Sequence, residues 1–213
     1  MSEVKPSAYV ALLGDLVGSR SAPVRSDLHR RLVDALAAAN TGRGVLDPLR
    51  VTAGDEFQGV FATLGDALAA SYGVRLALRP ADVRFGLGVG TVEVIDRDAN
   101  VQDGSAWWAA RAAIEAVEAA ARGARRALRT GIGTAHDLPR PVGPLLAAVE
   151  LVDAGLYGLD DADADILVGL RAGRSQAEAA AALGVTPSAV SQRVARGGLA
   201  ILADAMTRLE EAR

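Results

Sequence analysis

The segment from Val51 to Phe61 constrains the fold most, because it joins two short apolar strands through an acidic turn. Its sequence is Val-Thr-Ala-Gly-Asp-Glu-Phe-Gln-Gly-Val-Phe, which predicts a hairpin with Asp55 and Glu56 at its tip. A third acid, Asp15, ends an apolar run near the N-terminus and precedes a loop of small residues. Magnesium prefers one or two carboxylates plus substrate phosphates. These strand-end acids therefore predict a site for a divalent cation that carries a nucleoside triphosphate.

Apolar periodicity predicts the order of the elements. Strands are expected at 9–16, 49–52, 56–62, 83–94 and 125–131, and helices at 23–39, 64–76 and 105–122. The order is β-α-β-β-α-β followed by α-β, and its first six elements match the split βαβ, or ferredoxin-like, unit. In that topology the hairpin lies beside the end of the first strand. Asp15 and Asp55 are therefore expected to converge, although either one alone is open to a structural reading as a turn or hairpin residue.

The predicted strand at 83–94 has a bare face. Gly86, Gly88 and Gly90 alternate with apolar residues, so one side of this strand carries no side chains. Either another backbone packs against that side or a ligand does.

Composition narrows the classes of function. The chain has 213 residues, of which 50% are hydrophobic, enough for one large domain or two small ones. It has no cysteine, which excludes disulfides and thiolate sites, and two distant histidines, which argue against a zinc site or a Ser-His-Asp triad. His29 falls on a charged helix face, and no chemical role is expected for it. The sequence shows neither a signal peptide nor a membrane span, so a cytoplasmic protein without membrane contact is expected.

Residues 175–194 predict two helices joined by a tight turn. Ser175 and Glu178 form a capping box, Gly184 takes the left-handed closing position, and Thr186 caps the second helix. This pattern predicts a helix-turn-helix whose second helix enters the major groove of double-stranded DNA. The residues expected to contact DNA are Thr186, Ser188, Ser191, Gln192, Arg193 and Arg196.

A helical packing module that never contacts DNA is the alternative for this region. Residues 163–213 carry six basic and six acidic side chains, so they gain no net attraction to phosphates. The net charge of the whole chain, -3, also disfavours non-specific coating of nucleic acid but leaves a localised contact open.

Several N-terminal motifs resemble the catalytic domain of class III nucleotidyl cyclases and the related GGDEF domains. Residues 12–18, Leu-Leu-Gly-Asp-Leu-Val-Gly, are similar to the first metal-binding strand, and residues 52–61 to the second metal-binding hairpin. Residues 85–92 are similar to the strand that follows. Residues 104–111, Gly-Ser-Ala-Trp-Trp-Ala-Ala-Arg, take the place of a cyclase helix that carries an Asn and an Arg. Together the motifs resemble the SatD family more closely still, and the resemblance covers about residues 8–130.

The resemblance implies roles for named residues. Asp15 and Asp55 would hold magnesium, and Glu56 is a further candidate ligand. Arg111 would reach a phosphate, and Arg20 is added as a second candidate from its place beside the loop. Backbone amides of the loop would cradle the phosphates, as turn amides do. The loop residues concerned are Leu16, Val17, Gly18 and Ser19.

Three positions depart from the cyclase pattern. Trp107 stands where a cyclase has its transition-state Asn, Val51 replaces the base-reading Lys of many adenylyl cyclases, and Ala53-Gly54 replaces the double glycine of diguanylate cyclases. The residues that would bind metal and phosphate therefore match the cyclase pattern. The residues that would read the base and stabilise the transition state do not. This combination favours a nucleotide binder over a conventional cyclase.

We therefore expect an α+β protein. A ferredoxin-like βαββαβ domain of the nucleotidyl cyclase type is expected over residues 1–137. A stiff proline-containing connector leads to a linker helix and a small all-α helix-turn-helix domain over residues 138–213. The expected function is a nucleotide-sensing, DNA-binding transcription regulator that uses magnesium and acts as a homodimer, because cyclase-type sites are completed across a dimer interface.

Two alternatives remain open. The first is an active nucleotidyl cyclase or nucleotidyltransferase that uses Asp15 and Asp55, and pyrophosphate release abolished by Asp55→Asn would favour it. The second is a scaffold that dimerises and binds DNA without a nucleotide. Full DNA binding by an Asp15→Ala, Asp55→Ala variant, regardless of nucleotide, would support that alternative.

Overall fold

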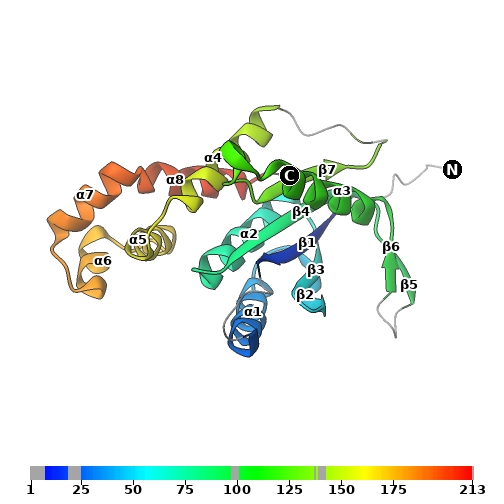
Figure 1. Ribbon diagram of the computed structural model, residues 1–213, viewed down its shortest axis with the longest axis horizontal. Helices are drawn as coiled ribbons and strands as arrows, with labels where there is room; N and C mark the ends of the chain where they lie inside the picture. Colours follow the sequence, from blue (N-terminus) through cyan, green and yellow to red (C-terminus); the bar gives the residue numbers. More distant parts are fainter. Residues whose placement is uncertain (1–7, 19–24, 97–100, 137, 139–142, 213) are drawn as a thin grey trace.

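The computed structural model describes residues 8–18, 25–96, 101–136, 138 and 143–212, and it has a mixed α+β fold. Its main sheet has the strand order β2-β3-β1-β4-β7 (Figure 1). Neighbouring strands are antiparallel except β4 and β7, which are parallel. The five strands are β1 (Tyr9–Val17), β2 (Val45–Ala53), β3 (Glu56–Phe61), β4 (Asp82–Gly90) and β7 (Thr130–Thr134).

The helices lie on both faces of the sheet and extend away from it. In the view of Figure 1, α6 and α7 lie at one end of the molecule and a small hairpin, β5 (Glu93–Asp96) with β6 (Val101–Asp103), lies at the other. A 3-10 turn, Gly123–Arg125, precedes β7. The helices are α1 (Arg25–Ala39), α2 (Leu64–Leu78), α3 (Ser105–Ala120), α4 (Gly143–Tyr157), α5 (Asp161–Arg171), α6 (Gln176–Leu183), α7 (Pro187–Gly197) and α8 (Leu199–Leu209).

The apolar run near the N-terminus forms the central strand, as predicted. β1 pairs with β3 on one side and with β4 on the other. The first six elements follow the predicted β-α-β-β-α-β order, and the β2–β3 hairpin lies beside β1. Asp15 has two direct cross-strand partners, Glu56 in β3 and Arg84 in β4.

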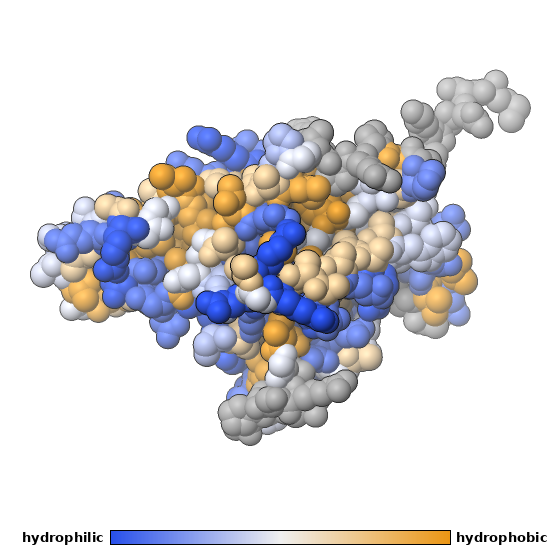
Figure 2. All heavy atoms as spheres, turned by 45° about the horizontal axis from the view of Figure 1, so that its top comes forward, coloured by the Kyte–Doolittle hydropathy of each residue, from blue (hydrophilic) through white to orange (hydrophobic). Residues whose placement is uncertain are grey.

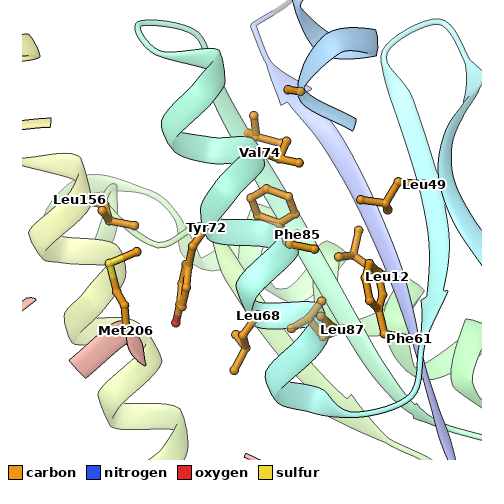
Figure 3. Packing of buried hydrophobic residues seen from close by; sticks show 14 of the residues in the cluster. Leu12, Leu49, Phe61, Leu68, Tyr72, Val74, Phe85, Leu87, Leu156 and Met206 are labelled. Carbon is orange, nitrogen blue, oxygen red and sulfur yellow. The ribbon is translucent and has the colours of Figure 1, made fainter. Parts of the chain in front are cut away.

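One face of the sheet is covered by α1 and α2. Leu12, Phe85 and Leu87 of the sheet lie in the same buried cluster as Leu68 and Tyr72 of α2 (Figure 3). Thr63 caps α2 by accepting a hydrogen bond from the backbone N–H of Asp66 at 3.1 Å. This layer forms the main hydrophobic core of the molecule.

The opposite face of the sheet is covered by α3, which packs on the glycine-lined side of β4. A Cβ atom added at Gly88 would overlap the carbonyl oxygen of Ala106 and the backbone nitrogen of Ala110. A Cβ atom at Gly86 would meet the carbonyl oxygen of Ala110 in the same way. The glycines therefore let the backbone of α3 lie directly on the sheet, and of the two predicted occupants it is another backbone that packs there.

The C-terminal helices α4 and α8 continue the main core. Leu156 of α4 and Met206 of α8 lie beside Tyr72 of α2 (Figure 3). A separate cluster lies among α5, α6, α7 and the start of α8, and includes Ile166, Val190 and Leu199. In the described part of the chain, this separate cluster begins after α4. The predicted domain boundary between residues 137 and 138 stays a prediction.

A buried ion pair ties α4 to the sheet. Asp153, fully buried, accepts a hydrogen bond from Arg75 Nη1 of α2 at 2.6 Å. Its other oxygen accepts the backbone N–H groups of Arg129 and Thr130, both at 2.7 Å. Burial raises the pKa of Asp153 above its ordinary value, and the Arg75 charge and these hydrogen bonds offset only part of that rise. The pair holds α2, α4 and the start of β7 together.

Three strands differ from the prediction by more than two residues at one end or both. β2 begins at Val45 rather than Leu49, because an edge strand with a register shift between Asp47 and Arg50 tolerates the proline at position 48. The predicted strand at 83–94 leaves the sheet after Gly90, and its remainder pairs with part of the predicted loop as β5 and β6. β7 begins later than predicted and runs through Gly131 and Gly133, which lie against the α3 backbone.

Apolar side chains also reach the surface. Leu151 is 72% exposed and Ile201 is 75% exposed. Figure 2 shows apolar areas on the face turned toward the reader, with hydrophilic side chains between them. Single exposed apolar residues are normal on folded proteins. In the described part of the chain, no helix is long and apolar enough to cross a membrane.

Candidate functional site

Asp15 lies at the end of β1 and is held by a bidentate arginine. Arg84 Nε donates to Asp15 Oδ1 at 3.0 Å, and Arg84 Nη2 donates to Oδ2 at 2.8 Å. Arg84 Nη1 lies 2.9 Å from Glu118 Oε1 of α3. Burial lowers the pKa of Arg84, but the hydrogen bonds and charges of Asp15 and Glu118 outweigh it and raise that pKa. The guanidinium therefore stays charged and fixes the orientation of the Asp15 carboxylate.

Glu56 and Arg111 lie next to Asp15 on the α3 side of the sheet. Arg111 Nη2 is 3.8 Å from Glu56 Oε2, and both side chains are about half exposed. Both line a cavity of about 180 Å³, which we call the acidic cleft. The acidic cleft is lined by Leu13, Gly14, Asp15, Thr52, Glu56, Phe57, Arg111, Ile114, Glu115 and Glu118.

Asp55 lies at the tip of the β2–β3 hairpin, in the position predicted for it. Ala53 and Glu56 are paired, so Gly54 and Asp55 form the two-residue turn. Gly54 has φ +63°, the left-handed conformation that such turns require. Asp55 lines a different cavity, of about 300 Å³, which we call the α1 pocket. The α1 pocket is lined by Leu16, Ser26, Leu28, His29, Leu32, Gly54 and Asp55.

The three predicted metal ligands therefore surround one end of β1 but divide between two cavities. Asp15 and Glu56 line the acidic cleft, and Asp55 lines the α1 pocket. Among the described residues, no group of three or more His, Cys, Asp or Glu side chains is arranged to hold a metal ion. That a single cation joins Asp15 to Asp55 stays a prediction.

The donor set of the acidic cleft fits magnesium. Carboxylate oxygens are hard ligands, and magnesium needs only one or two of them when phosphates and waters complete its shell. Arg84 already binds both oxygens of Asp15. A carboxylate offers about four lone-pair positions, so each oxygen keeps one acceptor position. Asp15 and Glu56 are therefore the residues of the cleft that would hold the ion.

The predicted phosphate loop is described only in part. Leu16 is buried, whereas Val17 and Gly18 are exposed where β1 ends. Gly18 has φ +71°, so the chain turns there in a conformation that favours glycine. Ser19 and Arg20 lie outside the described residues.

Trp107 packs instead of taking up the role of the cyclase Asn. Its ring lies against the small cluster formed by Ala11, Leu13 and Ala106 between β1 and α3. Its indole nitrogen is buried without a hydrogen-bond partner among the described residues. The neighbouring Trp108 is 67% exposed and donates its indole N–H to Asp103 at 3.0 Å.

The predicted caps of the C-terminal helix pair are present. Ser175 Oγ accepts the backbone N–H of Glu178 at 3.2 Å, and Glu178 accepts the backbone N–H of Ser175 at 2.7 Å. Gly184 has φ +66° and closes α6. Thr186 Oγ1 accepts the backbone N–H of Ala189 at 3.2 Å and starts α7. These local interactions fix a tight turn between two short helices.

The predicted DNA-contacting residues fall into two groups. Arg193 donates from Nη1 to Asp160 and Asp163, each at 2.8 Å, and so ties α7 to the start of α5. These hydrogen bonds raise the pKa of Arg193, and the hydrogen bond from Arg193 lowers the pKa of Asp160. Arg193 is therefore engaged inside the helical unit. The exposed group consists of Thr186, Ser188, Ser191, Gln192 and Arg196.

Sequence reasoning missed several residues that line the two cavities or contact a lining residue. Glu115 and Glu118 follow Arg111 at positions i+4 and i+7 of α3, a spacing that places all three on one helix face. That signal was readable. Arg84 gave no such signal, because only the register of β4 against β1 brings it to Asp15. His29 was assigned no role, yet it lines the α1 pocket together with Asp55.

Comparison with protein-family models matches residues 9–209 to the model described as the SatD family. The match includes the sheet, the lining residues of both cavities and the C-terminal helices through α8. Comparison with curated proteins gives no match.

Proposed function

The chain belongs to the SatD family, and we propose that it is a DNA-binding transcription regulator that senses a magnesium-bound nucleotide. One observation carries the proposal. Asp15, Glu56 and Arg111, from three different elements, line one cleft beside the hairpin turn that presents Asp55. Carboxylates with a neighbouring arginine are the groups that a metal–polyphosphate needs, and they gather at the end of a strand where a loop begins.

The order of the elements supports a cyclase-type interpretation of residues 1–137. The β-α-β-β-α-β unit has the β2–β3 hairpin on one side of β1 and β4 on the other, as expected for a ferredoxin-like unit. The capped pair α6 and α7 likewise supports a helix-turn-helix in residues 138–213. Neither assignment depends on the identity of the nucleotide.

Four charged residues in or beside the cleft have roles in this proposal. Asp15 and Glu56 bind the cation, and Arg84 keeps the Asp15 carboxylate aimed into the cleft. Arg111 binds a phosphate oxygen. Bound magnesium would neutralise phosphate charge and so lower the repulsion between the polyphosphate and the four carboxylates of the cleft.

DNA binding is assigned to the exposed face of α7. Gln192 and Arg196 are the residues on this face best suited to base edges and phosphates. One such module buries little surface, so a homodimer is proposed to reach useful affinity. Selection from random duplex DNA tests the proposed DNA binding. The full chain should enrich a specific sequence, and the double variant Gln192→Ala, Arg196→Ala should enrich none. Failure of the unaltered chain to enrich any sequence, with or without nucleotide, contradicts DNA binding.

Thermal unfolding tests nucleotide binding. A ligand that binds only the native state, present at a free concentration of 100 times its Kd, raises the free energy of unfolding by about 2.7 kcal/mol. For a chain of this length we expect Tm to rise by about 5–10 °C with magnesium and the preferred nucleoside triphosphate. Glu56→Gln should reduce the rise, because it removes a cation ligand from an exposed position. Asp34→Asn, exposed on α1 and outside both cavities, should leave it intact. No rise with ATP, GTP, CTP or UTP contradicts the proposal.

A further inference from the structure

The α1 pocket differs in chemistry from the acidic cleft, although residues of the β2–β3 hairpin line both. Its walls are apolar where Leu16, Leu28 and Leu32 line it. Among the described residues that line it, three carry polar side chains, namely Ser26, His29 and Asp55. Apolar walls with a small number of placed polar groups are typical of pockets that bind uncharged, ring-containing parts of ligands.

The two cavities lie on opposite sides of the end of β1. Asp15 lines the acidic cleft, and the next residue, Leu16, lines the α1 pocket. This follows from strand geometry, since consecutive side chains point to opposite faces of a sheet. A ligand long enough to cross the end of β1 would have one part in each cavity. A nucleotide has two matching parts, a polyphosphate that requires charge and a planar base that requires apolar walls.

We propose that the α1 pocket is the subsite for the base of the nucleotide, with His29 hydrogen-bonding to the edge of the ring. This inference rests on the proposed function, and it adds the residue that distinguishes one base from another. The imidazole of His29 has one donor and one acceptor when neutral, so it matches ring nitrogens and exocyclic groups. Leu16, Leu28 and Leu32 contact the faces of the ring. Ser26 and Asp55 add polar groups at the pocket wall.

Calorimetric titration of the full chain separates the base from the phosphates. The probes are ATP, GTP, CTP, UTP and inorganic tripolyphosphate, each with magnesium. The unaltered chain should bind one nucleotide more tightly than it binds tripolyphosphate. His29→Ala should weaken that nucleotide by about tenfold, the value of one hydrogen bond, and leave tripolyphosphate unchanged. Arg30→Ala is the matched control, because Arg30 is exposed on the same helix and lies outside the pocket.

Each outcome decides between the proposals. Loss of base preference in His29→Ala, with normal tripolyphosphate affinity, supports the base subsite. An unaltered chain that binds nucleotides and tripolyphosphate equally, or a His29→Ala variant with unchanged preference, overturns the base subsite and leaves the magnesium–polyphosphate site standing. An unaltered chain that binds none of the probes overturns both. Because His29 is exposed, its replacement should not unfold the protein, and the Tm of the free variant checks this.

Discussion

Replacing Gly88 by valine should prevent the protein from folding to a stable state. A Cβ atom at this position overlaps the carbonyl oxygen of Ala106 and the backbone nitrogen of Ala110. Those atoms belong to the α3 backbone, which cannot move away without losing its contacts with β1, β4 and β7. We expect a loss of at least about 4 kcal/mol in the free energy of unfolding, measured by urea denaturation, or insoluble protein.

Gly73→Ala is the matched control for Gly88→Val. Gly73 lies inside α2 and a Cβ atom there meets no other atom within 4 Å. Alanine should therefore raise the free energy of unfolding by about 0.5–1 kcal/mol, because glycine is the poorer helix former. A Gly88→Val variant as stable as the unaltered chain would contradict the direct packing of α3 on the sheet.

Replacing Asp153 by alanine should cost about 3–5 kcal/mol of stability, because it leaves the charge of Arg75 buried without its partner. The same change removes the acceptor for the N–H groups of Arg129 and Thr130. Urea denaturation followed by circular dichroism measures the loss. Asp27→Ala is the control: its ion pair with Arg30 is exposed, and its removal should cost less than about 1 kcal/mol.

The two Asp variants also test how the C-terminal helices are attached. If Asp153→Ala and Asp27→Ala destabilise the protein equally, the carboxylate of Asp153 does not hold α4 on the sheet. A large loss restricted to Asp153→Ala supports one core that continues from α2 into α4 and α8.

The sequence predicted turns and helix ends correctly where interactions between residues close in sequence determine the structure. Gly54 adopts the left-handed conformation that a two-residue turn needs, so Gly54 and Asp55 reverse the chain. The two flanking strands can then pair as a hairpin. The caps of α6 and α7 were readable for the same reason: Ser175, Glu178 and Thr186 bond to backbone groups within three residues. The central position of β1 followed from its continuous apolar run.

Interactions across elements were not predictable in the same way. The alternating glycines of β4 fitted either a ligand or another backbone, and only the position of α3 decides between them. The pairing of Asp15 with Arg84 depends on the β1–β4 register, which no local pattern specifies. The same applies to Arg193, whose partners Asp160 and Asp163 come from another helix.

One buried interaction did leave a readable signal. Asp153 lies four residues after Val149 and three before Leu156, so it falls on the apolar face of α4. Arg75 lies three residues after Tyr72 on the buried face of α2. A charged residue inside an apolar stripe predicts a buried partner, because an unpaired buried charge is too costly. The two helices supplied one charge each.

A crystal structure of the full chain with magnesium and a non-hydrolysable nucleoside triphosphate would decide whether the acidic cleft binds a metal–nucleotide. We expect a metal ion about 2.0–2.1 Å from a carboxylate oxygen of Asp15 or Glu56, with the polyphosphate in the acidic cleft and within reach of Arg111. At saturating ligand, a cleft that holds neither metal nor phosphate, with Arg84 still bound to both oxygens of Asp15, would contradict this proposal.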